Sequence, residues 1–268
     1  MKRPTPPTDG ADPWARLRAL TPARIGLPRT GASLSTDAVL RFAMAHAEAR
    51  DAVHTPADME ALREPLARVG FPTIPVSSAV GSRGTYLRRP DLGRRLSPES
   101  RARIEAEARG LVDIALVVAD GLSSTAVQAG AVPLLEAFAP WIAREGWSVA
   151  PVSLAVQARV ALGDEIGALF RARAVVVLVG ERPGLSASDS LGLYLTYDPR
   201  VGRTDAQRNC ISNVRPGGLS HGESAFKLHW LLRRALDLRL SGVALKDESD
   251  LAALEPRPEA ARLGPGDA

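Results

Sequence analysis

Short apolar runs rich in β-branched residues recur along the later part of the chain, and helical patterns separate most of them. Such runs are typical of strands that are buried on both faces of a sheet. Strands that alternate with helices form βαβ units, so we expect an α/β fold with a parallel sheet and helices on both faces. The expected strands are LVDIALVVADG (111–121), SVAPVSLAV (148–156), AVVVLVG (174–180), LGLYLTY (191–197) and SGVAL (241–245).

Two of the segments outside these runs have long helical patterns. Residues 124–146 are broadly apolar, and we expect a helix pair broken or kinked at Pro133 and Pro140, because proline removes an amide donor and clashes with the preceding turn. Residues 223–242 predict an amphipathic helix with His229 at the edge of its apolar stripe, so a packed or surface histidine is expected there rather than a ligand. The stripe consists of Ala225, Leu228, Leu232, Ala235 and Leu236.

The N-terminal part of the chain shows helical patterns and no convincing strand up to about residue 75. In residues 34–53, Ser35 or Thr36 is a candidate N-cap, and apolar residues then recur on one helical face. That face consists of Val39, Phe42, Ala43 and Ala47. The pattern predicts a small helical unit ahead of the sheet.

Four segments are therefore expected along the chain. A basic stretch, TYLRRPDLGRRLS, joins the helical unit to the sheet as a solvated linker or as an interface, with a turn at Pro90 and Asp91. The two ends are rich in Pro, Gly and Asp, and the first lacks the apolar segment of a signal peptide. The segments are a flexible leader (1–20), an N-terminal helical domain (21–75), a sheet domain (76–250) and a flexible tail (251–268).

Composition argues against two classes of partner. The 34 basic and 30 acidic residues give a net charge of +4, but the two signs are interleaved, and 4% aromatic content leaves few side chains to stack on nucleic-acid bases. No apolar stretch approaches the roughly 18 residues that a membrane span needs. We therefore expect neither nucleic acid nor membrane as a partner. Cys210 is the only cysteine, which excludes an internal disulfide and fits a reducing cytoplasm.

Standard nucleotide and metal signatures are missing from the sequence. There is no G-x-G-x-x-G and no G-x-x-x-x-G-K-[ST], so a standard dinucleotide enzyme or P-loop NTPase is not expected. The four histidines and one cysteine show no spacing typical of a metal site. No resident metal site is expected on this chain.

One candidate ligand site lies where the first expected strand meets a helix, in ADGLSSTAV (119–127). Asp120 and Gly121 make the turn, and Ser123 or Ser124 can cap the helix. Free amides at a helix N-terminus bind phosphate groups. Simple capping without a ligand is the alternative.

A second candidate is GERPGL (180–185), which follows the run 174–180. In open α/β sheets the residues just past the carboxyl ends of strands line the ligand crevice. Glu181 and Arg182 therefore form either an internal ion pair or part of a ligand site. Similar polar stretches flank other strands, namely RVALGDEIG (159–167), GRTDAQRNCISNVRPGGL (202–219) and SGVALKDE (241–248).

Two further pairs could carry catalysis. Asp164 and Glu165 lie in a short predicted helix, but adjacent carboxylates on a helix point about 100° apart and are usually solvated. Arg208 could favour a Cys210 thiolate, yet no base is paired with this thiol in the sequence, and a buried inert cysteine is the alternative.

Taken in order, these motifs resemble the small (light) subunits of ethanolamine ammonia-lyase, the adenosylcobalamin-dependent enzyme that converts ethanolamine to acetaldehyde and ammonia. The resemblance covers about residues 23–246. It is carried by ARIGLPRTGASLSTDAVLRFAMAHAEARDAV, YLRRPDLGRRL, VVADGLSSTAV, RVALGDEIG, GERPGLSASDSLGLYLTY, DAQRNCISN and SGVALK.

The resemblance implies a Rossmann-like sheet domain preceded by the helical portion. It also implies a large partner subunit, a TIM barrel, that holds the substrate and its catalytic residues. Adenosylcobalamin would be bound base-on between the subunits, which agrees with the absence of the D-x-H-x-x-G motif that supplies a histidine to cobalt. Six copies of each subunit would assemble as a hetero-oligomer.

The family's cobalamin contacts fall on Val160, Glu181 and Cys210, each within a matching motif. Val160 would make apolar contact, Glu181 would accept hydrogen bonds from corrin amides, and Cys210 would offer a small polarizable surface. Arg182 would orient Glu181, and Gly180 with its neighbours would let backbone approach the ring. The resemblance implies no catalytic residue on this chain.

The resemblance also indicates where in the cell the protein is expected. Some family members carry a longer N-terminal extension associated with bacterial microcompartments, whereas this leader is short and proline-rich, so a free cytoplasmic enzyme is expected. Two other functions stay open from the residues alone. One is a stand-alone Rossmann-like enzyme or binding protein that uses ADGLSS for a phosphate-bearing ligand. The other is a basic nucleic-acid-binding protein, which the low aromatic content argues against.

Overall fold

The computed structural model describes residues 14–250. Its α-helices are α1 (Ala15–Arg18), α2 (Thr36–His54), α3 (Arg63–Arg68), α4 (Arg83–Arg88), α5 (Pro98–Glu107), α6 (Ser124–Glu145), α7 (Leu162–Leu169) and α8 (His221–Leu238). Its strands are β1 (Arg29–Thr30), β2 (Ser33–Leu34), β3 (Thr73–Ser77), β4 (Val112–Ala119), β5 (Val152–Val156), β6 (Ala172–Gly180), β7 (Leu191–Tyr197) and β8 (Asn209–Val214). Short 3-10 helices are η1 (Glu60–Leu62), η2 (Leu92–Arg94), η3 (Asp205–Gln207) and η4 (Gly242–Ala244).

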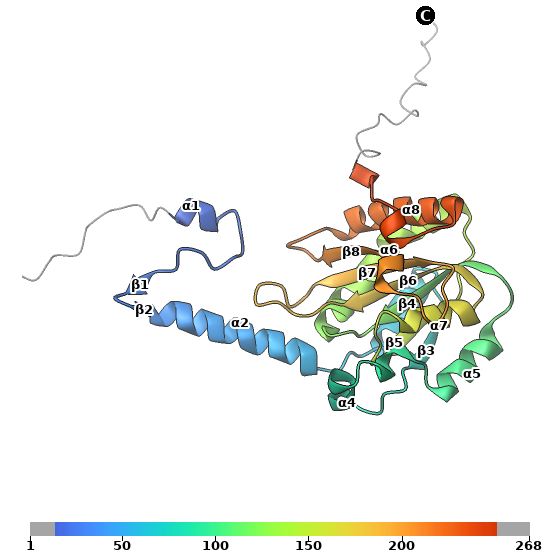
Figure 1. The fold of residues 1–268 in the computed structure, drawn as a ribbon, viewed down its shortest axis with the longest axis horizontal. Coiled ribbons are helices and arrows are strands. Elements are labelled where there is room, and N and C mark those ends of the chain that lie inside the picture. Colours follow the sequence, from blue (N-terminus) through green and yellow to red (C-terminus); the bar gives the residue numbers. More distant parts are fainter. Residues whose placement is uncertain (1–13, 251–268) are drawn as a thin grey trace, which may run out of the picture.

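Six strands form one sheet in the order β3-β5-β4-β6-β7-β8 (Figure 1). The first four are parallel, whereas β7 pairs antiparallel with β6 and β8 pairs antiparallel with β7. The expected α/β class is confirmed, but the sheet is mixed rather than wholly parallel. No crossover helix lies between β6 and β7, so the chain turns back through residues 181–190 and pairs antiparallel.

Helices cover both faces of the parallel part. On one face, α6 and α8 pack on alternate residues of β4 and β6, including Leu116 and Leu178. On the other face, α5 and α7 pack on the intervening residues, including Val117 and Val177. Figure 1 shows α8 above the sheet and α5 below it. Because both faces are covered, these strands read as continuous apolar runs.

Strand β3 was not predicted. Its segment contains Pro75, and proline cannot donate to a strand ladder, so the sequence reads as a loop. The strand lies at the edge of the sheet, beside β5 only, where a missing donor is tolerated. The boundary that we drew between residues 75 and 76 falls inside this strand.

The C-terminal strand prediction was wrong. SGVAL was expected to be a strand, but η4 occupies this segment. Side chains hold it across the ends of β7 and β8, because Ser241 Oγ accepts from Tyr197 N at 2.9 Å and Asn209 Oδ1 accepts from Gly242 N at 2.8 Å. The sixth strand is instead β8, NCISNV, where only Ile211 and Val214 are buried.

Helix α6 is one continuous helix of 22 residues, so the expected break was wrong. Pro133 and Pro140 lie inside it, off the buried face. Packing of that face on the sheet outweighs the lost backbone hydrogen bonds. By length and composition α6 could cross a membrane, but its residues Leu134, Leu135 and Phe138 are part of the core beside the sheet.

The other helix predictions have mixed outcomes. All five residues of the predicted stripe in α8 are buried, and His229 packs against Trp141 with 4.3 Å between ring centroids. Helix α2 begins after Ser35, whose Oγ accepts from Ala38 N at 3.3 Å, as predicted. Its expected apolar face is not buried, because Val39 and Phe42 are about half exposed, at 49% and 48%.

Helix α2 extends away from the sheet, with residues 14–34 at its far end (Figure 1). The predicted leader lies partly outside the described residues, and its described end contains α1. The predicted tail, 251–268, lies outside them entirely. Residues 14–34 contact the β6–β7 loop, where Arg24 Nη2 donates to Leu185 O at 3.0 Å.

Candidate functional site

The loops after β4, β5 and β6 meet at the carboxyl end of the sheet. The chain leaves β4 toward α6 on one face and leaves β5 toward α7 on the other. Neighbouring strands whose loops diverge in this way leave a crevice between them, and ligands bind there in open α/β sheets. A pocket of about 410 Å³ lies at this position.

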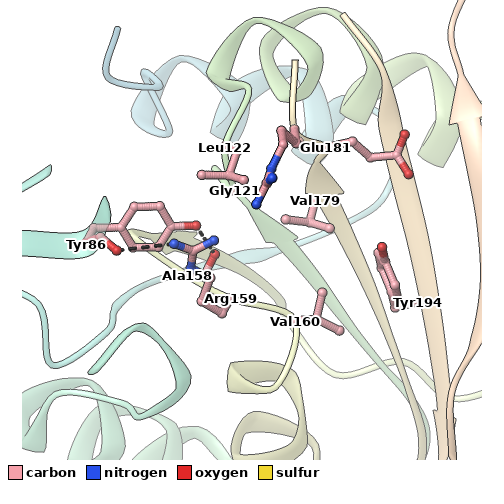
Figure 2. Close-up of a pocket in the computed structure, with 11 residues that line it drawn as sticks. Tyr86, Gly121, Leu122, Ala158, Arg159, Val160, Val179, Glu181 and Tyr194 are labelled. Atoms are coloured by element: carbon pink, nitrogen blue, oxygen red, sulfur yellow. Dashed lines mark hydrogen bonds between the residues drawn. The ribbon is translucent and has the colours of Figure 1, made fainter. Parts of the chain in front are cut away.

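The pocket is lined by residues from five parts of the chain. Figure 2 shows Tyr86 and Arg159 on one side, Glu181 and Tyr194 on the other, and Val160 and Val179 between them. The remaining lining residues are Gly121, Leu122, Ala158, Gly180 and Arg182.

Asp120 joins the loops after β4 and β5. Its carboxylate accepts from the backbone N–H groups of Gln157 at 2.8 Å and Ala158 at 3.0 Å. Arg83 of α4 donates to the same carboxylate at 3.3 Å. Burial raises the pKa of Asp120, while the two amides and the guanidinium oppose that shift. The sequence predicted a turn here but not this contact between loops.

Two glycines bring the loops after β4 and β6 into backbone contact. Leu122 N donates to Gly180 O at 2.9 Å, and a Cβ on Gly180 would lie 1.9 Å from Ser123 O. Gly121 has φ of +58°, a conformation that favours glycine. Because Gly180 has no side chain, the backbone of Ser123 can lie directly against it.

The predicted capping role of the ADGLSS turn is confirmed. Ser123 Oγ accepts from Ala126 N at 3.1 Å and so caps α6. The Ser123 hydroxyl also donates to Ser188 O at 2.6 Å, which ties the β6–β7 loop to the same turn.

Tyr86 forms a buried aromatic wall of the pocket. Two guanidinium groups lie over its ring, with Cζ of Arg159 at 4.2 Å and Cζ of Arg83 at 4.7 Å from the centroid. Its hydroxyl donates to Ala158 O at 3.0 Å. Burial raises the pKa of Tyr86 to about 12, so the phenol stays neutral near pH 7. The basic stretch 85–97 is thus partly built into the fold, since Tyr86 and Leu96 are buried.

Glu181 is held by polar groups from neighbouring strands. Ser190 Oγ donates to its Oε2 at 2.5 Å, and Asn213 N donates to the same oxygen at 3.4 Å. The ion pair considered between Glu181 and Arg182 does not form, and Arg182 makes no ion pair within residues 14–250. Oε1 of Glu181 accepts no hydrogen bond from the described part of the chain.

Val160 and Glu181 line the same pocket, whereas Cys210 lies beside it. Cys210 is an exposed residue of β8, directly opposite the pocket residue Tyr194 of β7. Strand alternation places both on the face of the sheet that carries Val177.

Neither reading of Cys210 is confirmed as stated: the residue is exposed rather than buried, and Arg208 does not favour its thiolate. Partial desolvation raises the pKa of the Cys210 thiol, a hydrogen bond with Tyr194 opposes that shift, and the Glu181 carboxylate raises it further. The guanidinium of Arg208 is bound to Asp164 instead, with distances of 2.5 and 2.6 Å.

Asp164 and Glu165 are buried, so the expectation of two solvated carboxylates was wrong. Asp164 also brings Arg208 beside Thr196 Oγ1, at 2.9 Å. Glu165 binds Arg101 of α5 and accepts from Leu96 N at 2.9 Å. The two carboxylates therefore fix different segments and do not form a general acid/base pair. Within residues 14–250, no group of three or more His, Cys, Asp and Glu side chains could hold a metal ion.

The sequence matches one protein family over most of its length. The family model for the ethanolamine ammonia-lyase light chain matches residues 11–246. The chain belongs to this family. The small subunit of ethanolamine ammonia-lyase from Azotobacter vinelandii is 57% identical over 258 residues, covering 95% of this chain and 94% of the relative.

Two other small subunits also match this chain over most of its length. The small subunit from Xanthomonas campestris pv. campestris is 56% identical and covers 92% of each chain. The one from Pseudomonas aeruginosa is 53% identical, covering 97% of this chain and 95% of its own. The family resemblance inferred from the motifs is confirmed.

Proposed function

We propose that this chain is the small subunit of an ethanolamine ammonia-lyase, which converts ethanolamine to acetaldehyde and ammonia with adenosylcobalamin. The observation that carries this proposal is the family match over residues 11–246, together with relatives named as small subunits at 53–57% identity. The enzyme is a carbon–nitrogen lyase, and the name of these relatives implies a large partner subunit.

The polar groups of the pocket fit the edge of a corrin ring. Cobalamin carries amide side chains around its ring, and these need both donors and acceptors. Oε1 of Glu181 is left to accept from an amide N–H group, since the hydrogen bonds that this carboxylate accepts within residues 14–250 go to Oε2. Val160 offers an apolar surface in the same pocket.

The sheet beside the pocket also fits a flat ligand. On the face that carries Cys210, the neighbouring positions of β7 and β8 include Gly192, Tyr194 and Ser212, and both Cys210 and Ser212 are exposed. We therefore propose that Val160, Glu181 and Cys210, the three positions that the family resemblance implies, contact cobalamin. Held by these residues, adenosylcobalamin would supply the radical chemistry of the reaction.

The role of this chain is to bind and orient the cofactor and to exclude water from it. Within residues 14–250 the buried carboxylates Asp120, Asp164 and Glu165 are each bound to an arginine, so none of them is a free base. Substrate binding and proton transfer then belong to the large subunit. The chain should be inactive alone.

Helix α2 supports a contact with the large subunit. Leu40 and Met44 are 64% and 63% exposed on a helix that stands away from the sheet. Exposed apolar groups of this kind mark surfaces that a partner covers. We propose that the helical unit expected over 21–75 acts in assembly, and that the Rossmann-like cobalamin domain expected over 76–250 also includes the whole of β3, from Thr73. The assembled enzyme would contain six copies of each subunit, in the cytoplasm.

Ammonia release from ethanolamine and adenosylcobalamin tests this function. The assay uses the chain alone, the cognate large subunit alone and their mixture. Activity only in the mixture is expected. Turnover by this chain alone would favour the stand-alone enzyme, and a folded but inactive mixture would overturn the substrate assignment.

Glu181→Ala tests the cofactor contact. We expect weaker cobalamin retention by the assembled enzyme with folding intact, because the variant removes the free acceptor. Unchanged retention would refute the role of Glu181. Glu105→Ala, which removes an exposed carboxylate on α5 that does not line the pocket, is the matched control.

A further inference from the structure

The cationic side chains in and beside the pocket differ in whether a carboxylate offsets their charge. Arg83, which lies over the ring of Tyr86 and does not line the pocket, is paired with Asp120 at 3.3 Å. Arg159 and Arg182 line the pocket itself, and neither forms an ion pair with another residue in the range 14–250. The pocket therefore presents two guanidinium groups that no described carboxylate neutralises.

Arg159 is held in a fixed position. Its guanidinium lies over the ring of Tyr86, and its Nη2 donates to Tyr86 O at 3.2 Å, as Figure 2 shows. Its backbone N–H donates to Gly93 O at 2.9 Å, and a Cβ on Gly93 would lie 3.0 Å from Arg159 Cγ. Because Tyr86 is fully buried, the surface on which Arg159 stacks is rigid.

One donor of Arg159 is buried without a partner. Its Nε is withdrawn from solvent and makes no hydrogen bond. A guanidinium has five N–H donors, and a buried donor without an acceptor is rare in folded proteins. The guanidinium therefore has unused donor capacity, and an anion beside its accessible part would offset a charge that no described carboxylate neutralises.

We propose that Arg159 binds the phosphodiester of the cobalamin nucleotide tail, with Arg182 as a second cation. This inference rests on the proposed function. The corrin amides are neutral, whereas the phosphodiester is anionic, and a planar guanidinium matches two phosphate oxygens in geometry and charge. Glu181 lies on the other side of the pocket in Figure 2, so the amide-binding and phosphate-binding groups are separated.

The test compares ligands that differ by the phosphate group. The assembled enzyme is titrated with cobinamide, cobinamide phosphate and cyanocobalamin, and affinity is read from the absorbance spectrum rather than from activity. The variants are Arg159→Gln, which removes the charge, and Arg159→Lys, which keeps it. Arg233→Gln, an exposed arginine on α8 remote from this pocket, is the matched control.

We expect Arg159→Gln to weaken cobinamide phosphate and cyanocobalamin by roughly tenfold to a hundredfold, since it removes a charge-assisted hydrogen bond. Cobinamide affinity should stay within about twofold, and Arg159→Lys should restore part of the loss. Arg182→Gln should show the same pattern with a smaller loss. Assembly of each variant with the large subunit is verified first by size exclusion.

Two other outcomes would overturn the inference in distinguishable ways. Equal losses for cobinamide and cobinamide phosphate would show that Arg159 shapes the pocket without binding phosphate, and would leave the proposed function standing. No binding of any of the three ligands by the unmodified complex would refute the proposed function itself.

Discussion

The parallel and antiparallel parts of the sheet differ in what covers them. Strands β4 and β6 are enclosed by helices on both faces, and Leu116, Val117 and Leu178 are almost fully buried. Strands β7 and β8 are packed beneath α8 on one face, while Cys210 and Ser212 are exposed on the other. The parallel part supplies a rigid frame, and the open face of the antiparallel part is left for contact with other molecules.

Besides the pairing of β6 with β7, the buried Asp164–Arg208 pair connects the two parts. It joins α7 to the start of β8, and both side chains are 2% exposed. In Arg208→Met a buried carboxylate loses its partner, so the free energy of unfolding should fall by about 3–5 kcal/mol. Urea denaturation measures the loss.

A double variant controls for this effect. Combining Arg208→Met with Asp164→Leu removes both charges and should recover most of the stability. If the single variant lost no more than about 1 kcal/mol, as for an exposed pair, the two parts would not be coupled through this contact.

Matched substitutions compare how much the buried strand β6 and the exposed face of β8 contribute to the free energy of unfolding. Leu178→Ala in β6 leaves a cavity and should cost about 2–5 kcal/mol of unfolding free energy. Ser212→Ala in β8 should change it by no more than about 0.5 kcal/mol, because the side chain is exposed. Thermal and urea unfolding compare the two. Equal losses of unfolding free energy would contradict the difference in burial between these two positions.

Gly192 tests how closely Glu181 packs on the antiparallel part. A Cβ there would lie 2.8 Å from Glu181 Oε1 and 3.1 Å from Tyr194 Cε2. Gly192→Ala should therefore move the carboxylate and cost about 1 kcal/mol of unfolding free energy. Gly81→Ala is the control, since nothing lies within 4 Å of its Cβ position. Identical results for the two variants would show that the contact is not restrictive.

The smallest effect concerns Cys210 on the open face. Because its thiol pKa is raised, a smaller fraction is thiolate near pH 7 than in a free cysteine. Alkylation by iodoacetamide should be slower than for N-acetylcysteine and should rise about tenfold per pH unit below the pKa. Mass spectrometry of this single cysteine gives the rate. A rate above that of the free thiol would contradict the raised pKa.

The difference in burial between the parallel and antiparallel strands also explains how much of the fold could be predicted. The runs that became β4 and β6 are apolar throughout because both faces are buried, so the sequence shows them plainly. Strand β8 alternates exposed and buried residues, with only Ile211 and Val214 in the core, and it reads as a loop. Pro75 conceals β3 in the same way.

The candidate site was predictable only where it follows a strand. Glu181 could be placed because it comes directly after an apolar run, and Val160 and Cys210 came from the family motifs. Tyr86 and Arg159 are 73 residues apart in sequence, and nothing local to either indicates their contact. Stacking of this kind depends on tertiary packing.

The buried carboxylate of Asp120 has a consequence for association. It binds the amides of Gln157 and Ala158 and the guanidinium of Arg83, so the loops after β4 and β5 and helix α4 are ordered together when the chain folds. A ligand that binds between flexible loops must restrict them and loses affinity to their conformational entropy. Here that entropy is already lost before the ligand binds, which leaves more of the contact free energy for affinity.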